Sequence, residues 1–287
     1  MKIKKRASDY TPDMLPTNRK AVFFDLVKLH FWDLIKLGAL LLLFAMPMHL
    51  LAIGEDIITG SIYAQVQNAT TEQQQGAYLT LKAVQVLRAL LSTVLVPVFT
   101  VGLAGVLRVI RQYGWGENVF TVMDFFKGVR QNWKQITQLH LVMGVLYTLS
   151  LLAQQLADIS TGVAFWLLHI PMGVFVLVIL PVGGYAVAAI PVYSTSLFNH
   201  IRAGLQMYIK SLFSTLLGTL CAMALYLPLL IPHLYIHLFG GVIATLLTPV
   251  ILLGWCLFCY NKQDKFINST QHPELIGRGT LSAMEIE

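Results

Sequence analysis

Five long tracts without any Asp, Glu, Lys or Arg constrain this sequence more than any other feature. They cover residues 37–54, 89–107, 135–157, 159–201 and 211–261. A helix rises about 1.5 Å per residue, so about 20 residues cross the roughly 30 Å hydrocarbon core of a bilayer. Barrel strands would alternate apolar and polar residues, and these tracts do not, as LLLLF at 40–44 shows. We therefore predict an all-α, polytopic transmembrane helical bundle.

Turn residues and charges divide the two longest tracts. Pro228, Pro232 and His233 indicate a turn that makes a helical hairpin of 211–261. We interpret 159–201 as one span, because this places Arg202 with the other basic residues. About six spans result, at 37–53, 85–107, 138–157, 172–196, 212–231 and 238–260. They form a single transmembrane domain at 21–261, with tails at 1–20 and 262–287 and the largest loop at 54–82.

The distribution of basic residues predicts the orientation of the chain. With the N-terminus inside, all 20 lysines and arginines except Lys82 and Arg88 fall on the cytoplasmic side. Such a bias in short loops sets the direction of insertion. We therefore expect both termini in the cytoplasm and a multi-pass location in a bacterial cytoplasmic membrane. The net charge of +6 then reflects this topology and attraction to anionic membrane lipids, so nucleic acid is not an expected partner.

A short pattern recurs before the odd-numbered spans. It reads Phe24-x-x-Val27-Lys28-x-x-Phe31, then Phe126-x-x-Val129-Arg130-x-x-Trp133, then Phe198-x-x-Ile201-Arg202-x-x-Leu205. Positions i, i+3 and i+7 share one helix face, with a basic residue beside it. The even-numbered spans carry Pro-Val at 97–98, 181–182 and 249–250. This predicts a pseudo-threefold repeat of a leader helix plus a helical hairpin, with kinks at Pro97, Pro181 and Pro249. The alternative is chance matching, which apolar sequences produce easily.

Few residues indicate chemistry. His49, His169, His233 and His237 lie on the outer side and are weak candidates for a metal site, with Glu55, Asp56 and Asp158 as companions. The alternative is that these histidines meet lipid headgroups. No predicted span has an ionisable residue near its middle, which argues against a carboxylate-driven pump. Because no motif of nucleotide binding, metalloprotease or nucleophile chemistry occurs, we expect no cofactor and no enzymatic activity.

Several segments together resemble one family. They are VFFDLVKL at 22–29, PVFTVGLA at 97–104, VMDFFKGVRQNWKQ at 122–135, DKFIN at 264–268 and HPE at 272–274. They are similar to the YesL-like family of bacterial integral membrane proteins. The resemblance runs from about residue 20 to 278, and it is strongest between the second and third predicted spans. It implies association with carbohydrate-uptake systems and brings no established biochemical activity and no active-site residues.

Three functional hypotheses follow from these observations. The first is a non-enzymatic accessory or regulatory membrane protein, associated with an oligosaccharide uptake system through a carbohydrate import permease or a sensor protein. The second is a small-solute transporter or channel, and the third is a structural or lipid-organising protein. The sequence does not give the oligomeric state. The expected interface with a partner or with lipid comprises Phe24, Lys28, Phe126, Arg130, Trp133, Lys134, Phe198 and Arg202.

Overall fold

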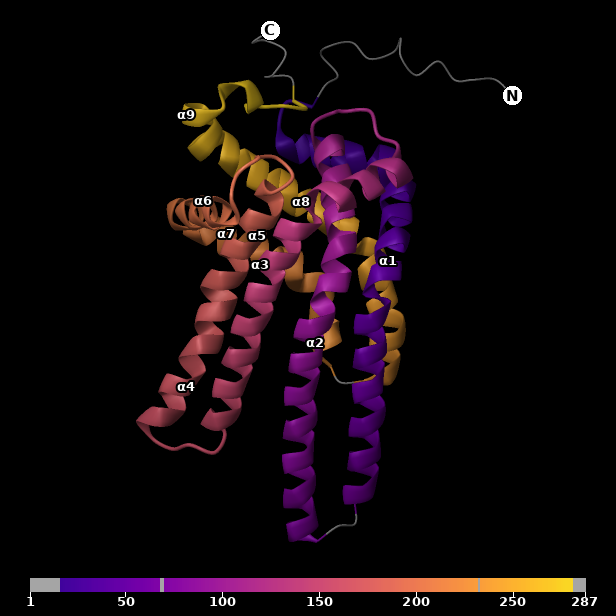
Figure 1. Cartoon of the computed structure of the whole chain (residues 1–287), viewed down its shortest axis with the longest axis vertical. Helices are drawn as coiled ribbons and strands as arrows, with labels where there is room; N and C mark the ends of the chain where they lie inside the picture. The colour runs from indigo at the N-terminus through magenta and orange to yellow at the C-terminus, as the bar shows by residue number, and fades with distance from the viewer. Residues whose placement is uncertain (1–15, 68–69, 232, 281–287) are drawn as a thin grey trace, which may run out of the picture.

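Among the residues that the structure describes, six helical segments are long and apolar enough to cross a membrane (Figure 1). The computed structural model describes residues 16–67, 70–231 and 233–280, and no strand occurs among them. The first three spans are α1 (Arg19–Val66), α2 (Thr71–Gly114) and α3 (Thr121–Ala157). The fourth joins α4 (Val163–Val174), the π-helical turn η2 (Phe175–Ile179) and α5 (Leu180–Ala189). This is the architecture of a multi-pass membrane protein.

The second half of the chain is less regular. After α6 (Leu197–Lys210), the fifth span joins α7 (Leu212–Met223) to a 3₁₀ segment, η3 (Ala224–Leu230). The sixth begins with a π-helical turn, η4 (Ile236–Gly240), and continues as α8 (Gly241–Gln263), η5 (Asp264–Asn268) and α9 (Ser269–Gln271). A last turn, η6, covers Pro273–Leu275. Each of the six predicted spans overlaps one of these segments, so the prediction of a six-span helical bundle is confirmed.

The first hairpin is much longer than predicted. Helices α1 and α2 have 48 and 44 residues and extend beyond the turn between α3 and α4 (Figure 1). At the start of α2, the Thr70 side chain accepts a hydrogen bond from the backbone of Gln73, and the Gln73 side chain accepts one from the backbone of Thr70. This capping box starts a helix within polar sequence. Most of the predicted loop at 54–82 is therefore helical, namely residues 54–66 and 71–82.

The fourth span is shifted from the predicted range of 172–196. It begins at Val163, because apolar residues already precede residue 172, and it ends at Ala189. After Ala189 the chain turns, and the backbone N–H groups of Val192 and Tyr193 both donate to the Ala189 carbonyl at 3.0 Å. Pro191 lies in this turn and has no N–H to continue the helical pattern. The range 159–201 holds one span, as predicted.

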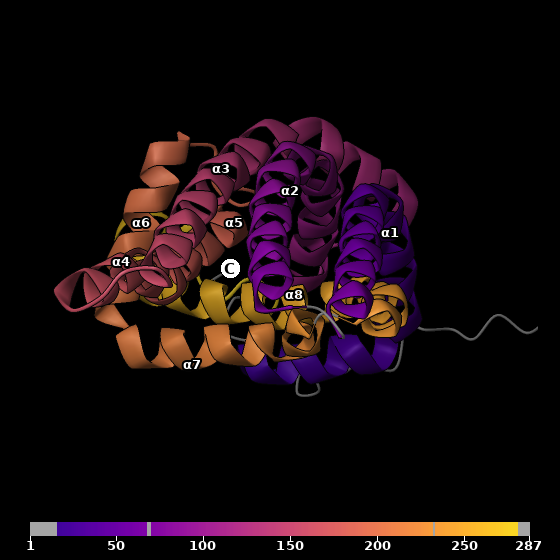
Figure 2. The same cartoon turned by 90° about the horizontal axis from the view of Figure 1, so that it is seen from below.

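The third leader segment forms a separate helix that lies across the bundle. Figure 1 shows α6 nearly end-on, and Figure 2 shows it from the side. Its N-cap is Ser196, whose side chain accepts from the backbone of Asn199. The helix buries His200, Gly204, Met207 and Tyr208 and exposes Phe198, Leu205 and Ile209. It is thus amphipathic, as the predicted leader pattern requires.

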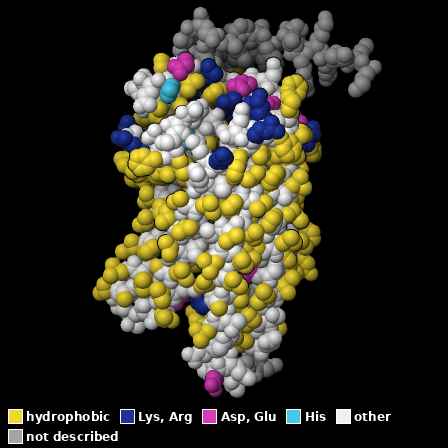
Figure 3. All heavy atoms as spheres, in the orientation of Figure 1, with side chains coloured by type: hydrophobic (Ala, Val, Ile, Leu, Met, Phe, Trp, Pro, Cys, Tyr) yellow, Lys and Arg dark blue, Asp and Glu magenta, His cyan; other side chains and the backbone are white. Residues whose placement is uncertain are grey.

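The core lies at one end of the bundle. Leu107 of α2, Phe125 of α3, Tyr185 of α5 and Leu253 of α8 are all fully buried there. In contrast, α4 buries none of its residues, and α7 buries only Thr215. Lysine and arginine side chains gather at the end that contains this core, on the face seen in Figure 3. We call it the basic end; it holds the starts of α1 and α3, the ends of α2 and α8, and α6.

Candidate functional site

The residues of the predicted interface lie on the surface at the basic end. Phe24, Phe126 and Phe198 are 59%, 52% and 72% exposed. Their basic companions, Lys28, Arg130 and Arg202, are also exposed. Trp133 is 40% exposed, and the Lys134 ammonium lies 5.9 Å from the centre of its ring. All eight predicted residues are thus accessible to a lipid surface or to another protein.

The three leader segments have the same pattern of burial. In each segment the residue at i+3 packs against the core, and these residues are Val27, Val129 and Ile201. The residue at i+7 is exposed in each, and these residues are Phe31, Trp133 and Leu205. The three segments differ in how they connect to the span that follows. Helix α1 has non-helical dihedral angles at His30, α3 is regular, and a break at Ser211 separates α6 from α7. The shared pattern supports repetition of the leader face, and the pseudo-threefold bundle stays a prediction.

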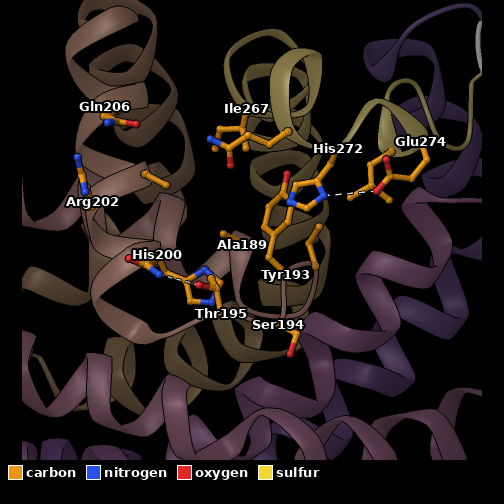
Figure 4. A pocket seen from close by; sticks show the side chains of 15 residues that line it. Ala189, Tyr193, Ser194, Thr195, His200, Arg202, Gln206, Ile267, His272 and Glu274 are labelled. Carbon is orange, nitrogen blue, oxygen red and sulfur yellow. Dashed lines mark hydrogen bonds and ion pairs between the residues drawn. The ribbon is translucent and has the colours of Figure 1, made fainter.

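A polar cavity of about 680 Å³ opens at the same end (Figure 4). One wall is α6, with Arg202 and Gln206, and the opposite wall is the segment around Ile267, His272 and Glu274. The turn that follows α5 contributes Tyr193, Ser194 and Thr195. The volume falls in the range of about 300 to 1,000 Å³ that is typical of small-molecule sites. Among the lining residues, the sequence analysis had named only Arg202 as part of the expected interface.

The cavity combines charged and neutral polar groups. His200 is 1% exposed, and its Nε2 atom has no hydrogen-bond partner. Burial lowers the pKa of His200, so this imidazole is neutral at pH 7. Burial and the nearby Asp264 carboxylate raise the pKa of Tyr193, whose hydroxyl donates to Asn268 Oδ1 at 2.7 Å. On the opposite wall, His272 Nδ1 lies 3.4 Å from Glu274 Oε1.

The segment after residue 262, predicted as a tail, folds against the bundle as far as residue 280. Asp264 pairs with Arg19 at 2.8 Å, and its Oδ1 atom accepts from Asn268 Nδ2 at 2.8 Å. Arg19 also donates to the carbonyl oxygen of Arg278 at 2.5 Å. The predicted N-terminal tail similarly ends inside helix α1, which starts at Arg19, and residues 1–15 lie outside the described residues. Arg19 therefore links the start of α1 to the C-terminal segment.

The four outer histidines do not come together as one group. His237 Nδ1 lies 2.5 Å from Asp56 Oδ2, and His49 Nε2 lies 2.9 Å from the Thr245 hydroxyl. His169 lies on α4, where its Nδ1 atom contacts the Phe165 carbonyl at 2.8 Å. The ring of His233 packs on Tyr235. Within the described ranges, no three His, Cys, Asp or Glu side chains are placed to hold a metal ion.

Several ionisable side chains lie in the parts of α1 and α2 that extend beyond the predicted spans or near the ends of those spans. Asp56 is in α1, and its neighbour Glu55 pairs with Arg88 of α2. Lys82 of α2 pairs with Asp158, the residue directly after α3. The sequence analysis placed these residues in a loop or at span ends, because it ended the first span at residue 53. The expectation that no span carries an ionisable residue near its middle stays a prediction.

The predicted kink prolines lie at two different kinds of position. Pro97 and Pro249 are inside α2 and α8, whereas Pro181 is in the first turn of α5, directly after the π-helical turn η2. Near Pro181, the Gly184 carbonyl accepts a hydrogen bond from Trp255 Nε1 at 2.9 Å. Local helix irregularity thus accompanies Pro181. Kinks at Pro97 and Pro249 stay predictions.

A second, largely apolar cavity of about 200 Å³ lies between the spans. It is lined by residues of α2, α3, α5, α7, η3 and α8, among them His140, Gly183, Tyr226 and Trp255. The Tyr226 hydroxyl lies 2.7 Å from that of Thr248. In the wall of the cavity, Thr219 Oγ1 is buried without a hydrogen-bond partner. This cavity offers a few polar groups in an apolar surrounding.

Comparison of the chain with protein-family models, curated proteins and solved structures finds no match.

Proposed function

We propose that this protein is a non-enzymatic accessory or regulatory subunit of a bacterial cytoplasmic membrane. In this proposal the basic end faces the cytoplasm, because lysine and arginine are retained on that side during insertion. The observation that carries the proposal is the set of three matched, exposed aromatic and basic faces of the leader segments. Aromatic residues and arginine are enriched in protein interfaces, so such a face suits docking to another protein.

The chemistry of the face indicates what would bind there. Lys28, Arg130 and Lys134 favour an acidic partner surface, and Phe24 and Trp133 favour apolar recesses in that surface. The resemblance to YesL-like proteins adds a candidate of the right kind, which is a carbohydrate import permease or its sensor protein. The polar cavity beside α6 would then lie next to the docked partner, where a bound solute could affect the interaction.

Site-specific photo-crosslinking in native membranes tests this proposal. A crosslinking residue is placed at Phe24, Trp133 or Phe198, and matched controls carry it at Leu149 or Leu217, which are 57% and 63% exposed on spans. We expect protein adducts from the basic-end positions and lipid adducts from the controls. Lipid adducts alone from all five positions would overturn docking to a partner and support the lipid-organising alternative.

The cavity between the spans favours a second candidate function, passage of a small solute. Transporters often have substrate sites near the membrane midplane beside irregular helices. The span that contributes Gly183 to this cavity contains the π-helical turn η2 and Pro181. Reconstitution into liposomes tests this alternative with sugar and ion fluxes. Flux that Pro97→Ala or Pro181→Ala removes would favour transport over the accessory role.

A further inference from the structure

A groove follows α8 on the surface of the bundle, between the start of α1 and α7. It consists of two cavities of about 320 and 250 Å³, which adjoin because both are lined by Phe23, Gly254 and Phe258. The first cavity lies at the basic end, where it reaches Lys20 and Asn261. The second extends farther along the spans and is also lined by Gly218, Cys221, Ala222, Val250, Ile251 and Trp255. We call the two cavities together the α8 groove.

Small side chains keep the α8 groove open. A Cβ atom at Gly254 would lie 3.4 Å from the ring of Phe23, and one at Gly218 would lie 3.5 Å from the ring of Phe258. Both are ordinary contact distances, and the nearest neighbours of the two glycines are side chains rather than a helix backbone. On the other side of the groove, α7 buries only Thr215. The protein itself therefore leaves space beside α8 that another molecule can fill.

The charges of the α8 groove gather at its basic end. The lining there includes Arg19 and Lys20, and none of the residues that line the groove is Asp or Glu. Arg19 is neutralised by Asp264 at 2.8 Å. In contrast, Lys20 is exposed and makes no ion pair within the described part of the chain. One ammonium group at this end is therefore available to an anion.

Lys262 adds a second positive charge on the α7 side of the groove. Its ammonium lies 5.4 Å from the centre of the Phe258 ring and donates to the Ser214 hydroxyl of α7 at 3.0 Å. The neighbouring Asn261 lines the groove, and its amide can donate a hydrogen bond. Two ammonium groups and one amide thus lie at this end without an acidic residue in the lining. This arrangement suits an anionic group with several acceptor oxygens, such as a phosphate.

The length of the α8 groove matches one leaflet of a bilayer. Asn261 and Val250 are 11 positions apart on α8, so the groove covers about 16 Å along the helix axis. Half of the roughly 30 Å hydrocarbon core is about 15 Å. When the charged end lies at the level of the lipid headgroups, the apolar part consequently reaches the middle of the membrane.

We propose that the α8 groove is a binding site for one anionic phospholipid. The phosphate lies between Lys20 and Lys262 and accepts a hydrogen bond from Asn261. One acyl chain lies along Gly254 and Gly218, between α1 and α7. Basic pockets between membrane-spanning helices are known to bind anionic headgroups. The bound lipid fills the space that the protein leaves open and so stabilises the position of α7.

The shape and charge of the groove favour this occupant over others. A partner helix is about 10 Å across and over the same length occupies more than about 1,000 Å³, so it is too wide to enter cavities of this size. A zwitterionic phospholipid brings its own ammonium group, which is repelled by the two lysines. This inference does not depend on docking of a protein at the leader faces, although Phe24 lines the edge of the first cavity.

Native mass spectrometry of the purified full chain in mild detergent tests the proposal. The probes are phosphatidylglycerol and phosphatidylcholine with identical acyl chains. We expect one phosphatidylglycerol per chain, bound at least about tenfold more tightly than phosphatidylcholine. A basic residue near an anionic lipid contributes enough to make Lys20→Gln and Lys262→Gln each weaken phosphatidylglycerol binding about fivefold. The control Lys265→Gln removes an exposed lysine that does not line the groove and should leave binding unchanged.

A second set of variants tests the apolar part of the groove. Gly218→Leu should weaken phosphatidylglycerol binding at least about tenfold, because its Cβ fits beside Phe258 and the rest of the side chain occupies the groove. The control Leu217→Ala changes the adjacent residue, which is 63% exposed, and should leave binding unchanged. Ala222→Phe fills the same cavity and decides if Gly218→Leu does not fold.

Two results would overturn the proposal. One is equal binding of the two lipids to the unaltered protein, and the other is equal binding by Lys20→Gln and Lys265→Gln. A photo-crosslinking residue at Ala222 in native membranes provides an independent check, for which we expect lipid adducts. Protein adducts at Ala222 would instead assign the groove to a partner. The mass spectrometry uses the protein without any partner, so failure of lipid binding is distinguishable from failure of docking at the leader faces.

Discussion

Removal of the Arg19 side chain should destabilise the protein far more than removal of an exposed ion pair. Arg19 is 8% exposed, and its guanidinium donates to Asp264 at 2.8 Å and to the carbonyl of Arg278 at 2.5 Å. A third contact places it 5.8 Å from the centre of the Tyr260 ring. The change Arg19→Leu removes these contacts and leaves the Asp264 carboxylate, 16% exposed, without its partner.

Loss of one partner of a buried ion pair costs about 3 to 5 kcal/mol. Asp264 is not completely isolated, because Asn268 Nδ2 and the backbone of Gly277 also donate to it. We therefore expect the lower value, about 3 kcal/mol, which is a change of more than about a hundredfold in the ratio of folded to unfolded protein. The control Lys36→Leu breaks the Lys36–Asp33 pair, whose side chains are 70% and 35% exposed, and should cost under about 1 kcal/mol.

Denaturant titrations of detergent-solubilised protein measure both changes, and a double-mutant cycle with Asp264→Leu isolates the pairwise interaction. We expect the double variant to be more stable than the sum of the single losses implies, since no charge then remains buried without a partner. Equal losses for Arg19→Leu and Lys36→Leu, or additive effects in the cycle, would refute the structural role of this contact.

Three further predictions concern single contacts. A Cβ at Gly38 would lie 2.2 Å from the Leu246 carbonyl oxygen, so Gly38→Ala should separate α1 from α8 and cost about 1 to 3 kcal/mol in the same denaturant titration. The hydroxyls of Thr100 and Thr137 lie 2.9 Å apart, so each Thr→Val change should cost about 0.6 to 2 kcal/mol of stability. In thermal melts, the double variant should lose less stability than the two single variants lose together. Burial lowers the pKa of His200 below 6.5, so the unfolded chain binds more protons there at low pH. Melting temperatures should consequently be unaffected by this residue above about pH 6.5 and fall as the pH drops below it, and His200→Gln should weaken that dependence.

The spans could be predicted because the absence of charge is a local property of the sequence. The same reasoning failed at 54–82, where polar residues were interpreted as a loop although α1 continues to Val66 and α2 begins at Thr71. Polarity indicates that a segment leaves the hydrocarbon, and it does not indicate that the helix ends there. The capping box at Thr70 and Gln73 was the available signal for the start of α2.

The leader faces could be predicted because helical spacing alone places Phe24 and Lys28 near each other. The cavity and the buried pairs could not, since they depend on contacts between distant segments. Arg19 and Asp264 are 245 positions apart, and Asp56 and His237 are 181 apart. Asp56 and His237 had been named only as members of a broader group of outer residues. Which of them pair depends on how η4 packs on α1, and no local pattern encodes that.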